Sequence, residues 1–164
     1  MLRQRNRLMC TKFFHLLAVS IAVCSCSETS IKETPQEVIK KYERLVLEMK
    51  ADSIARLFTA DAEIGHENQP IVKGRDSIYS FLLAFRNVRV INNRDQVHSL
   101  SIRNDSALVN GSYTQTVIIP VAIDDQSKTV SYKDTVNVAG NFTAIMIRDK
   151  NKWLISKMKT RSNQ

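Results

Sequence analysis

The chain has 164 residues, a length typical of one domain, and it contains only 4 Gly and 3 Pro residues. This scarcity argues against collagen-like repeats, glycine-rich phosphate loops and long disordered segments. The formal net charge is +8, but four of the 24 basic residues lie in an N-terminal segment without acids. The other 20 are nearly balanced by 16 acidic residues, are scattered along the chain, and accompany no nucleic-acid-binding motif. We therefore expect no nucleic-acid partner.

The N-terminal segment has the parts of a secretory signal. A basic start precedes an apolar run of about 11 residues, Phe13–Val23, which is too short to span a bilayer but suits a signal-peptide core. The run ends in V-C-S-C, which resembles a bacterial lipobox with the small Ser25 before the cut and Cys26 as lipid acceptor. We predict a signal peptide at 1–25 and a lipidated cysteine with a polar tether at 26–34. An ordinary cleaved signal or an uncleaved anchor is the alternative.

All three cysteines, Cys10, Cys24 and Cys26, lie in this segment. The domain that follows can therefore have no internal disulfide, thiol nucleophile or cysteine-based metal site. The three histidines lack metal-ligand spacing, and no Walker, dinucleotide or G-x-S-x-G motif occurs. We predict no metal and no cofactor. Lipid anchoring would place the domain at the bacterial cell envelope, on the periplasmic or outer-membrane side, with the membrane as a partner.

The domain is predicted at 35–164 and begins with helices. Thr34, Pro35 and Glu37 have the pattern of a capping box with proline in the first turn. Apolar residues then recur at helical spacing, and Asp52 suits the cap of a second helix that carries Phe58. A short strand is expected at 62–66. The predicted helical segments are 35–50, 52–58 and 76–85.

Beyond residue 88 the apolar residues alternate, as they do in β-strands. Turn-forming residues separate four such segments, so we expect consecutive antiparallel hairpins. Strands this long bend, and Gly111, Pro120 and Gly140 are the expected places. Helices followed by long strands indicate an α+β domain with its helices on one face of a curved sheet. The predicted strands are 88–103, 107–123, 129–148 and 152–160.

Three segments carry a resemblance to a known superfamily. They are A-D-S-I-A-R-L-F-T-A-D-A-E-I, V-K-G-R-D-S-I and G-N-F-T-A-I-M-I-R-D-K-N-K-W-L-I-S. Together they resemble the nuclear transport factor 2-like superfamily, and within it the SnoaL-like and ketosteroid-isomerase-like domains, over about residues 36–160. The resemblance implies a cone-shaped, cystatin-like α+β fold, with three N-terminal helices on a curved, mostly antiparallel sheet and a cavity between them. The superfamily includes isomerases, cyclases, dehydratases and non-catalytic binding domains, so it leaves the function open.

The ketosteroid-isomerase pattern can be compared position by position. That family places a Tyr donor sixteen residues before the Phe of its L-F motif, a base eight residues after it, and a second donor in a late strand. The matching positions here hold Tyr42, His66 and Gly140. Neutral imidazole can accept a proton near neutral pH, and a buried Tyr hydroxyl can donate to an enolate oxygen. His66 and Tyr42 are therefore the candidate catalytic pair, although a core tyrosine with a satisfied hydroxyl and a solvated loop histidine are the commoner explanations of these residues.

The cavity is expected to open near His66. Because the second donor is missing, we favour a non-catalytic module that holds a small apolar ligand or a partner protein at the membrane. The alternative is an isomerase or lyase that acts on a small apolar carbonyl compound, with His66 as base and Tyr42 as donor. As in relatives, the outer face of the sheet could pair with a second copy. The expected pocket walls include Phe58, Phe81, Phe85, Tyr113 and Asn141.

Overall fold

The structure is a computed structural model that describes residues 33–124 and 129–163, with the side chains of 121–134 also left out. The predicted signal peptide, Cys26 and most of the tether lie outside this part of the chain. Among the described residues no helix has the length and apolar character needed to cross a membrane. The helices and strands are α1 (Pro35–Leu47), α2 (Ala51–Ala55), β1 (Phe58–His66), β2 (Val72–Lys73), α3 (Arg75–Ala84), β3 (Arg89–Arg103), β4 (Ser106–Asp124), β5 (Thr129–Asp149) and β6 (Lys152–Ser162).

Helix α1 begins at the predicted capping box. The backbone N–H of Glu37 donates to Thr34 Oγ1 at 3.3 Å, and the backbone N–H of Thr34 donates to Glu37 Oε2 at 2.6 Å. The apolar side of the helix buries Val38 and Ile39 almost completely. The helix ends before the predicted boundary, because Met49 adopts a left-handed conformation with a φ of 50°. Helix α1 is therefore fixed at both ends by local features.

Helix α2 is shorter than predicted, and the expectation that it includes Phe58 is wrong. Phe58 is the first residue of β1 and pairs with Ile155 of β6. Its side chain is completely buried. Helical spacing of apolar residues could not anticipate this pairing, because the partner strand lies almost a hundred residues away. Asp52 lies in the first turn of α2, whose N-cap is Lys50.

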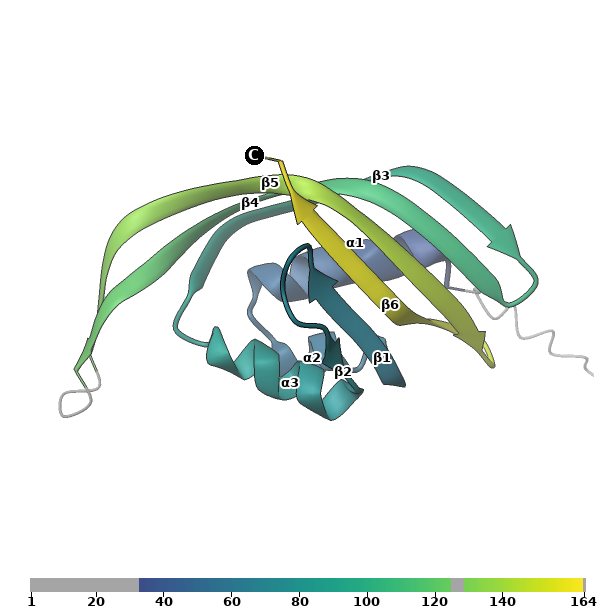
Figure 1. The fold of residues 1–164 in the computed structure, drawn as a ribbon, viewed down its shortest axis with the longest axis horizontal. Helices are drawn as coiled ribbons and strands as arrows, with labels where there is room; N and C mark the ends of the chain where they lie inside the picture. The colour runs from purple at the N-terminus through teal and green to yellow at the C-terminus, as the bar shows by residue number, and fades with distance from the viewer. Residues whose placement is uncertain (1–32, 125–128, 164) are drawn as a thin grey trace, which may run out of the picture. The chain divides into compact units, whose positions relative to one another are not determined.

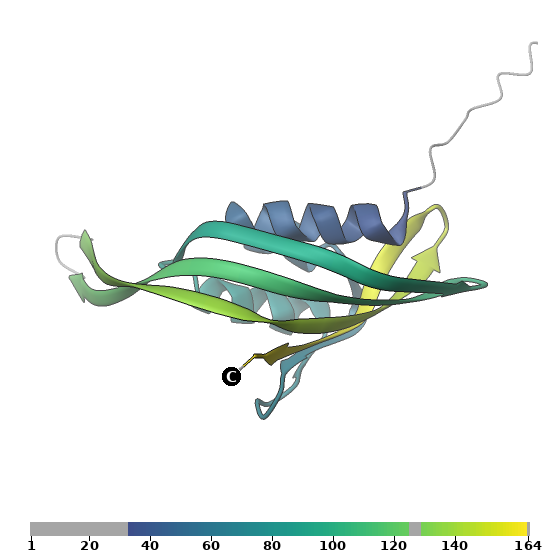
Figure 2. The same ribbon diagram turned by 90° about the horizontal axis from the view of Figure 1, so that it is seen from above.

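The six strands form one sheet in the order β2-β1-β6-β5-β4-β3. The predicted antiparallel hairpins β3–β4, β4–β5 and β5–β6 are confirmed, whereas β1 pairs with β6 in parallel. The sheet arches over the three helices, which lie under its concave face (Figure 1). Seen from above, the loop ends of β4 and β5 extend beyond the helices (Figure 2). The predicted α+β arrangement, with helices on one face of a curved and mostly antiparallel sheet, is confirmed.

The strands bend at some of the expected places. Register shifts occur on both sides of Pro120, as predicted. Near Gly111 the irregularity lies in the partner strand, between Val97 and Ser99 of β3. The pairing of β4 with β5 is regular through Gly140. Two of the three predicted bends therefore have a counterpart, one of them on the neighbouring strand.

The hydrophobic core fills one end of the concave face. Inward-facing residues of β5 and β6 alternate with outward-facing ones and pack against β1 and the helices. Burying each of these large side chains contributes about 1.5–3 kcal/mol. The side chains that are completely buried include Phe58, Ile78, Val109, Met146 and Ile155.

Candidate functional site

A polar cavity of about 350 Å³ lies at the other end of the concave face. We call it the polar cavity. Side chains from α1 and from every strand except β2 line it. Its lining includes both residues of the predicted catalytic pair and one predicted wall residue. Its polar groups include Tyr42 on α1, His66 on β1, Asn93 and Asp95 on β3, and Tyr113 on β4.

Asp95 is the most unusual residue of the polar cavity. It lies opposite Tyr113 in the β3–β4 register, and its Oδ2 atom is buried without a hydrogen-bond partner among the described residues. Burial, together with the nearby negative charge of Glu43, raises the pKa of Asp95 to about 7. Buried carboxylate oxygens normally have partners, and perturbed carboxyl groups concentrate at functional sites. Asp95 can therefore take up or release a proton near neutral pH.

Tyr42 places a hydroxyl group near this carboxyl. Burial, followed by the charges of Asp95 and Tyr113, raises the pKa of Tyr42, so its hydroxyl keeps its proton at neutral pH. Its ring packs edge-on against Phe58, with the two ring centroids 6.3 Å apart. The core thus holds the ring of Tyr42 while its hydroxyl remains available as a donor.

Tyr113 brings a second hydroxyl group to the site. Its ring lies over Gly140 on the neighbouring strand, and a Cβ atom added to Gly140 would lie 2.7 Å from Tyr113 Oη. The position that the resemblance assigns to the second donor therefore has no side chain, and the Tyr113 hydroxyl occupies the space where one would stand. The Tyr113 hydroxyl, contributed by β4 instead of β5, is therefore the candidate for the second donor.

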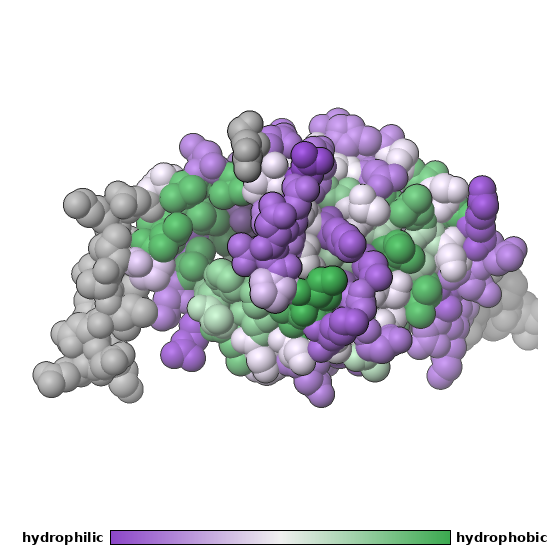
Figure 3. Space-filling view, viewed as in Figure 1, coloured by the Kyte–Doolittle hydropathy of each residue, from purple (hydrophilic) through white to green (hydrophobic). Residues whose placement is uncertain are grey.

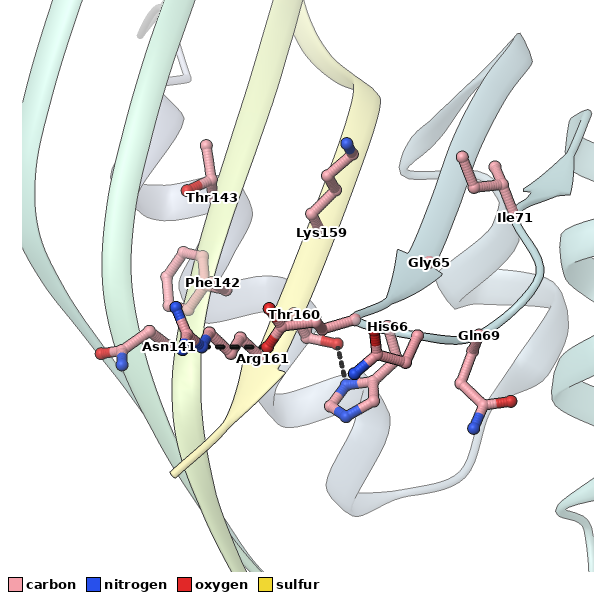
Figure 4. Close-up of a pocket in the computed structure, with 12 residues that line it drawn as sticks. Gly65, His66, Gln69, Ile71, Asn141, Phe142, Thr143, Lys159, Thr160 and Arg161 are labelled. Carbon is pink, nitrogen blue, oxygen red and sulfur yellow. Dashed lines mark hydrogen bonds and ion pairs between the residues drawn. The ribbon is translucent and has the colours of Figure 1, made fainter. Parts of the chain in front are cut away.

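His66 is half-buried at the end of β1 and is held from β6. Its Nδ1 lies 2.9 Å from Thr160 Oγ1, and its Nε2 lies 3.2 Å from Ser162 Oγ. Figure 4 shows the ring beside Thr160 and pointing away from Lys159. A neutral imidazole donates through one nitrogen and accepts through the other, so both hydroxyls fix the ring. His66 belongs to the cavity wall, and both of its nitrogens already have partners.

The structure places three of the predicted wall residues outside the polar cavity. Phe58 is completely buried in the core beneath Tyr42. Phe81 is 41% exposed on α3, because the side of this short helix that packs inward is occupied by Ile78. Asn141 lies on the outward side of β5 and donates to Asn163 Oδ1 at 3.0 Å.

Phe85 and His98 also lie elsewhere. Phe85 follows α3 and lines a separate, smaller cavity. Alternation with Leu100 predicts that His98 faces the covered side of the sheet, but His98 is exposed and its Nε2 lies 2.8 Å from Ser112 Oγ. The register shift between Val97 and Ser99 reverses the alternation and turns His98 outward.

Sequence reasoning missed Asp95, although a signal was present. Asn93, Asp95 and Val97 alternate along one predicted strand, and the inward position of an apolar Val97 places the acid on the covered face. An acid at an inward position of a half-buried strand is rare enough to indicate a site. The same alternation along β4 brings Tyr113 and Gln115 to the cavity.

The side chains of the polar cavity can transfer protons and donate hydrogen bonds. Asp95 supplies a carboxyl group that titrates near neutral pH, and Tyr42 and Tyr113 supply hydroxyl donors. Within 33–124 and 129–163, no group of three His, Cys, Asp or Glu side chains could hold a metal ion. The site is suited to a ligand with one polar group and an apolar body.

The family comparison fits this architecture. The family model of the SnoaL-like domain matches residues 29–159. The chain therefore belongs to the SnoaL-like domain family. A search of curated proteins finds no match.

Several solved structures share the fold of this chain. A ketosteroid isomerase-like protein from Erwinia carotovora atroseptica aligns over 79% of this chain and 93% of its own, with a TM-score of 0.61 and 13% identity. A protein from Novosphingobium aromaticivorans, provisionally described as a scytalone dehydratase, aligns over 79% and 81%, with a TM-score of 0.60 and 12% identity. A nuclear transport factor 2-like protein with a cystatin-like fold from the same organism aligns over 77% of each chain, with a TM-score of 0.54 and 16% identity. At these identities the likeness establishes the cystatin-like fold.

Proposed function

We propose that the chain is an acid–base enzyme of the isomerase or lyase type that acts on a small carbonyl compound. The proposal depends chiefly on the unpartnered Oδ2 atom of Asp95 in a cavity that also holds the hydroxyls of Tyr42 and Tyr113. Asp95 would be the base, in place of His66. His66 would shape the wall of the cavity, since Thr160 and Ser162 already occupy its two nitrogens.

The proposed chemistry begins with proton transfer. The Asp95 carboxylate would accept a proton from the carbon next to the carbonyl group. The electron pair of the broken C–H bond would stay on the substrate and form an enolate. Tyr42 and Tyr113 would donate hydrogen bonds to the enolate oxygen, where the negative charge develops. Asp95 would then return the proton to another carbon in an isomerisation, or a group beyond the enolate would leave in a lyase reaction. A pKa of about 7 suits a base that works near neutral pH.

A non-catalytic binding module is the other hypothesis from the sequence. The sequence favours it because Gly140 cannot act as the second donor, but the Tyr113 hydroxyl lies beside Gly140 and could donate in its place. The descriptions of two structural neighbours also name a ketosteroid isomerase-like protein and, provisionally, a scytalone dehydratase. These observations favour catalysis over binding alone.

Hydrogen–deuterium exchange tests the first step without knowledge of the natural substrate. The probe is 2-tetralone, a two-ring ketone with acidic hydrogens beside its carbonyl, followed by proton NMR in D₂O with the purified full-length chain. The wild type is expected to accelerate exchange over buffer. Asp95→Asn should lose about 10²–10⁴-fold of this rate, as expected for removal of a general base. Asp149→Asn makes the same change at an exposed site and should leave the rate unchanged.

Three outcomes would contradict catalysis by Asp95. Equal exchange rates for the wild type and Asp95→Asn would exclude this residue as the base. If the ketone binds but its exchange matches buffer, the binding-module hypothesis replaces the enzyme. If exchange is lost in His66→Ala but not in Asp95→Asn, His66 would be the base.

We further propose that Cys26 is lipidated and anchors the domain to the bacterial cell envelope. The support is the basic start, the apolar run Phe13–Val23 and the V-C-S-C sequence. Metabolic labelling with a fatty-acid analogue in a bacterial host should label the wild type and the Cys24→Ser variant equally. Cys26→Ser should abolish the label. Label that persists in Cys26→Ser, or that disappears only in Cys24→Ser, would contradict the assignment.

A further inference from the structure

A second cavity of about 170 Å³ lies beside the polar cavity. We call it the apolar cavity. Apart from the side chains that it shares with the polar cavity, its lining among the described residues is apolar and comes from the segments around α2 and α3, the start of β3, and β4. Six of the residues that line only this cavity are Met49, Ala51, Ile54, Leu82, Phe85 and Val88.

Three residues separate the two cavities. Tyr42, Val46 and Gln115 line both of them. Within the described part of the chain, the Gln115 side chain is held by one hydrogen bond, in which its Nε2 donates to Asn93 Oδ1 at 3.5 Å, at the long limit for such a bond. A weakly held side chain can move aside at small cost. The boundary between the two cavities is therefore thin and adjustable at Gln115.

The charges around the polar cavity select the kind of polar group that it would accept. Among the residues that the structure describes, its lining contains no Lys or Arg, whereas Asp95 lies in the wall and the charge of Glu43 acts on Asp95. A carboxylate or phosphate placed here would meet negative charge and no cation, and burying such a pair of like charges is unfavourable. An uncharged carbonyl or hydroxyl group meets only the hydroxyls, amides and imidazole of the wall.

The apolar cavity continues toward an apolar surface. Phe85 is 42% exposed at its edge, and Ile91 and Ile119 are 52% and 43% exposed on the neighbouring strands. Figure 3 shows hydrophobic side chains gathered where β4 and β5 extend past α3. A chain that leaves the apolar cavity would therefore remain in contact with apolar side chains.

We propose that the polar and apolar cavities are the two ends of one binding site, which takes an uncharged carbonyl compound with an alkyl tail. The carbonyl group lies among Asp95, Tyr42 and Tyr113, and the tail passes Gln115 toward Ala51. The identity of the carbonyl end rests on the proposed function. The evidence for the tail site is independent of the proposed function. It consists of the wall that the two cavities share and of the apolar lining.

Ligand-detected NMR titration of the full-length chain with 2-butanone, 2-octanone and octanoate tests this site. Because each buried methylene strengthens binding about fourfold, 2-octanone should bind at least about tenfold more tightly than 2-butanone. Ala51→Leu and Val88→Phe fill the apolar cavity from two different segments and should remove most of this difference. Ala84→Leu adds the same side chain at an exposed position of α3 that lines neither cavity, and it should leave the difference intact. Octanoate should bind more weakly than 2-octanone at pH 8.

Several results would overturn the proposal. Equal affinities of the wild type for the two ketones would do so without any variant. A preference for 2-octanone that survives both Ala51→Leu and Val88→Phe would place the tail elsewhere. Octanoate that binds as tightly as 2-octanone would contradict the exclusion of anions.

The exchange assay separates this proposal from the proposed function. If tail length strengthens binding but Asp95→Asn does not change α-hydrogen exchange of 2-octanone, the tail site stands and catalysis by Asp95 fails. If exchange depends on Asp95 but binding ignores tail length, catalysis stands and the tail site fails.

Discussion

The concave face of the sheet has a packed end and an open end. At the packed end, Met146 and Ile155 meet Phe58 and all three are completely buried. At the open end, β3 and β4 direct Asp95 and Tyr113 into a cavity, and one carboxylate oxygen has no partner among the described residues. The packed end stabilises the fold, whereas the open end lowers its stability. A costly polar group that is retained at a cavity indicates a functional site.

Phe58→Ala should have the largest effect on this contrast. It removes a completely buried ring from the packed end and should lower the free energy of unfolding by about 3–5 kcal/mol, measured by urea denaturation. Phe81→Ala is the matched control, because this ring is 41% exposed on α3 and its loss should cost less than about 1 kcal/mol. Similar losses for both variants would contradict the division into a packed and an open end.

Asp95→Asn should stabilise the protein, in a way that depends on pH. The unfolded chain loses this proton near the ordinary pKa of 3.8, whereas the folded chain keeps it until about pH 7. Between these values the folded state binds more protons, so this carboxyl makes stability fall as the pH rises. At pH 8 the variant should be more stable than the wild type by about 2–4 kcal/mol, and the gap should close below about pH 4. A variant that is less stable at pH 8 would contradict the burial of an unpartnered charge.

Gly140→Ala should disturb the packing around Tyr113 at the open end. Its Cβ would lie 2.7 Å from Tyr113 Oη and still closer to the backbone oxygen of Arg161, so both of these neighbours must shift. We expect a loss of about 1–3 kcal/mol together with weaker ligand binding. Gly65→Ala is the control, since its Cβ would meet Ile71 at an ordinary 3.4 Å. An unperturbed Gly140→Ala variant would refute the placement of Tyr113.

Tyr42→Phe should have the smallest effect on stability. The ring keeps its contact with Phe58, so the free energy of unfolding should change by less than about 0.5 kcal/mol. Binding of 2-tetralone should nevertheless weaken, because a donor to its oxygen is lost. A large loss of stability without any change in binding would assign the hydroxyl to the packed core instead.

Much of the fold could be predicted from local signals. The capping box at Thr34 and the alternation beyond residue 88 gave the start of α1 and the four long strands to within a few residues. Pairing between distant segments could not be predicted in this way. The assignment of Phe58 to a helix failed because its strand depends on β6, and His98 was misplaced because a bulge reverses alternation without changing composition.

The candidate site was predicted only in part, for a related reason. His66, Tyr42 and Tyr113 do line one cavity, but the resemblance directed attention to the position of Gly140 and away from β3. Three paired strands together determine which side chain occupies a given position in the cavity. The sequence of one strand alone does not contain this information. Asp95 becomes noticeable only when its burial and its missing partner are known.

The most direct test of this account is a carbon-13 NMR titration of the Asp95 carboxyl group in the full-length chain. We expect a midpoint near pH 7, well above the ordinary value of 3.8, together with loss of the signal in Asp95→Asn. A midpoint near 4 would mean that the carboxyl is solvated, and Asp95 could then be neither the costly group of the open end nor a base tuned to neutral pH.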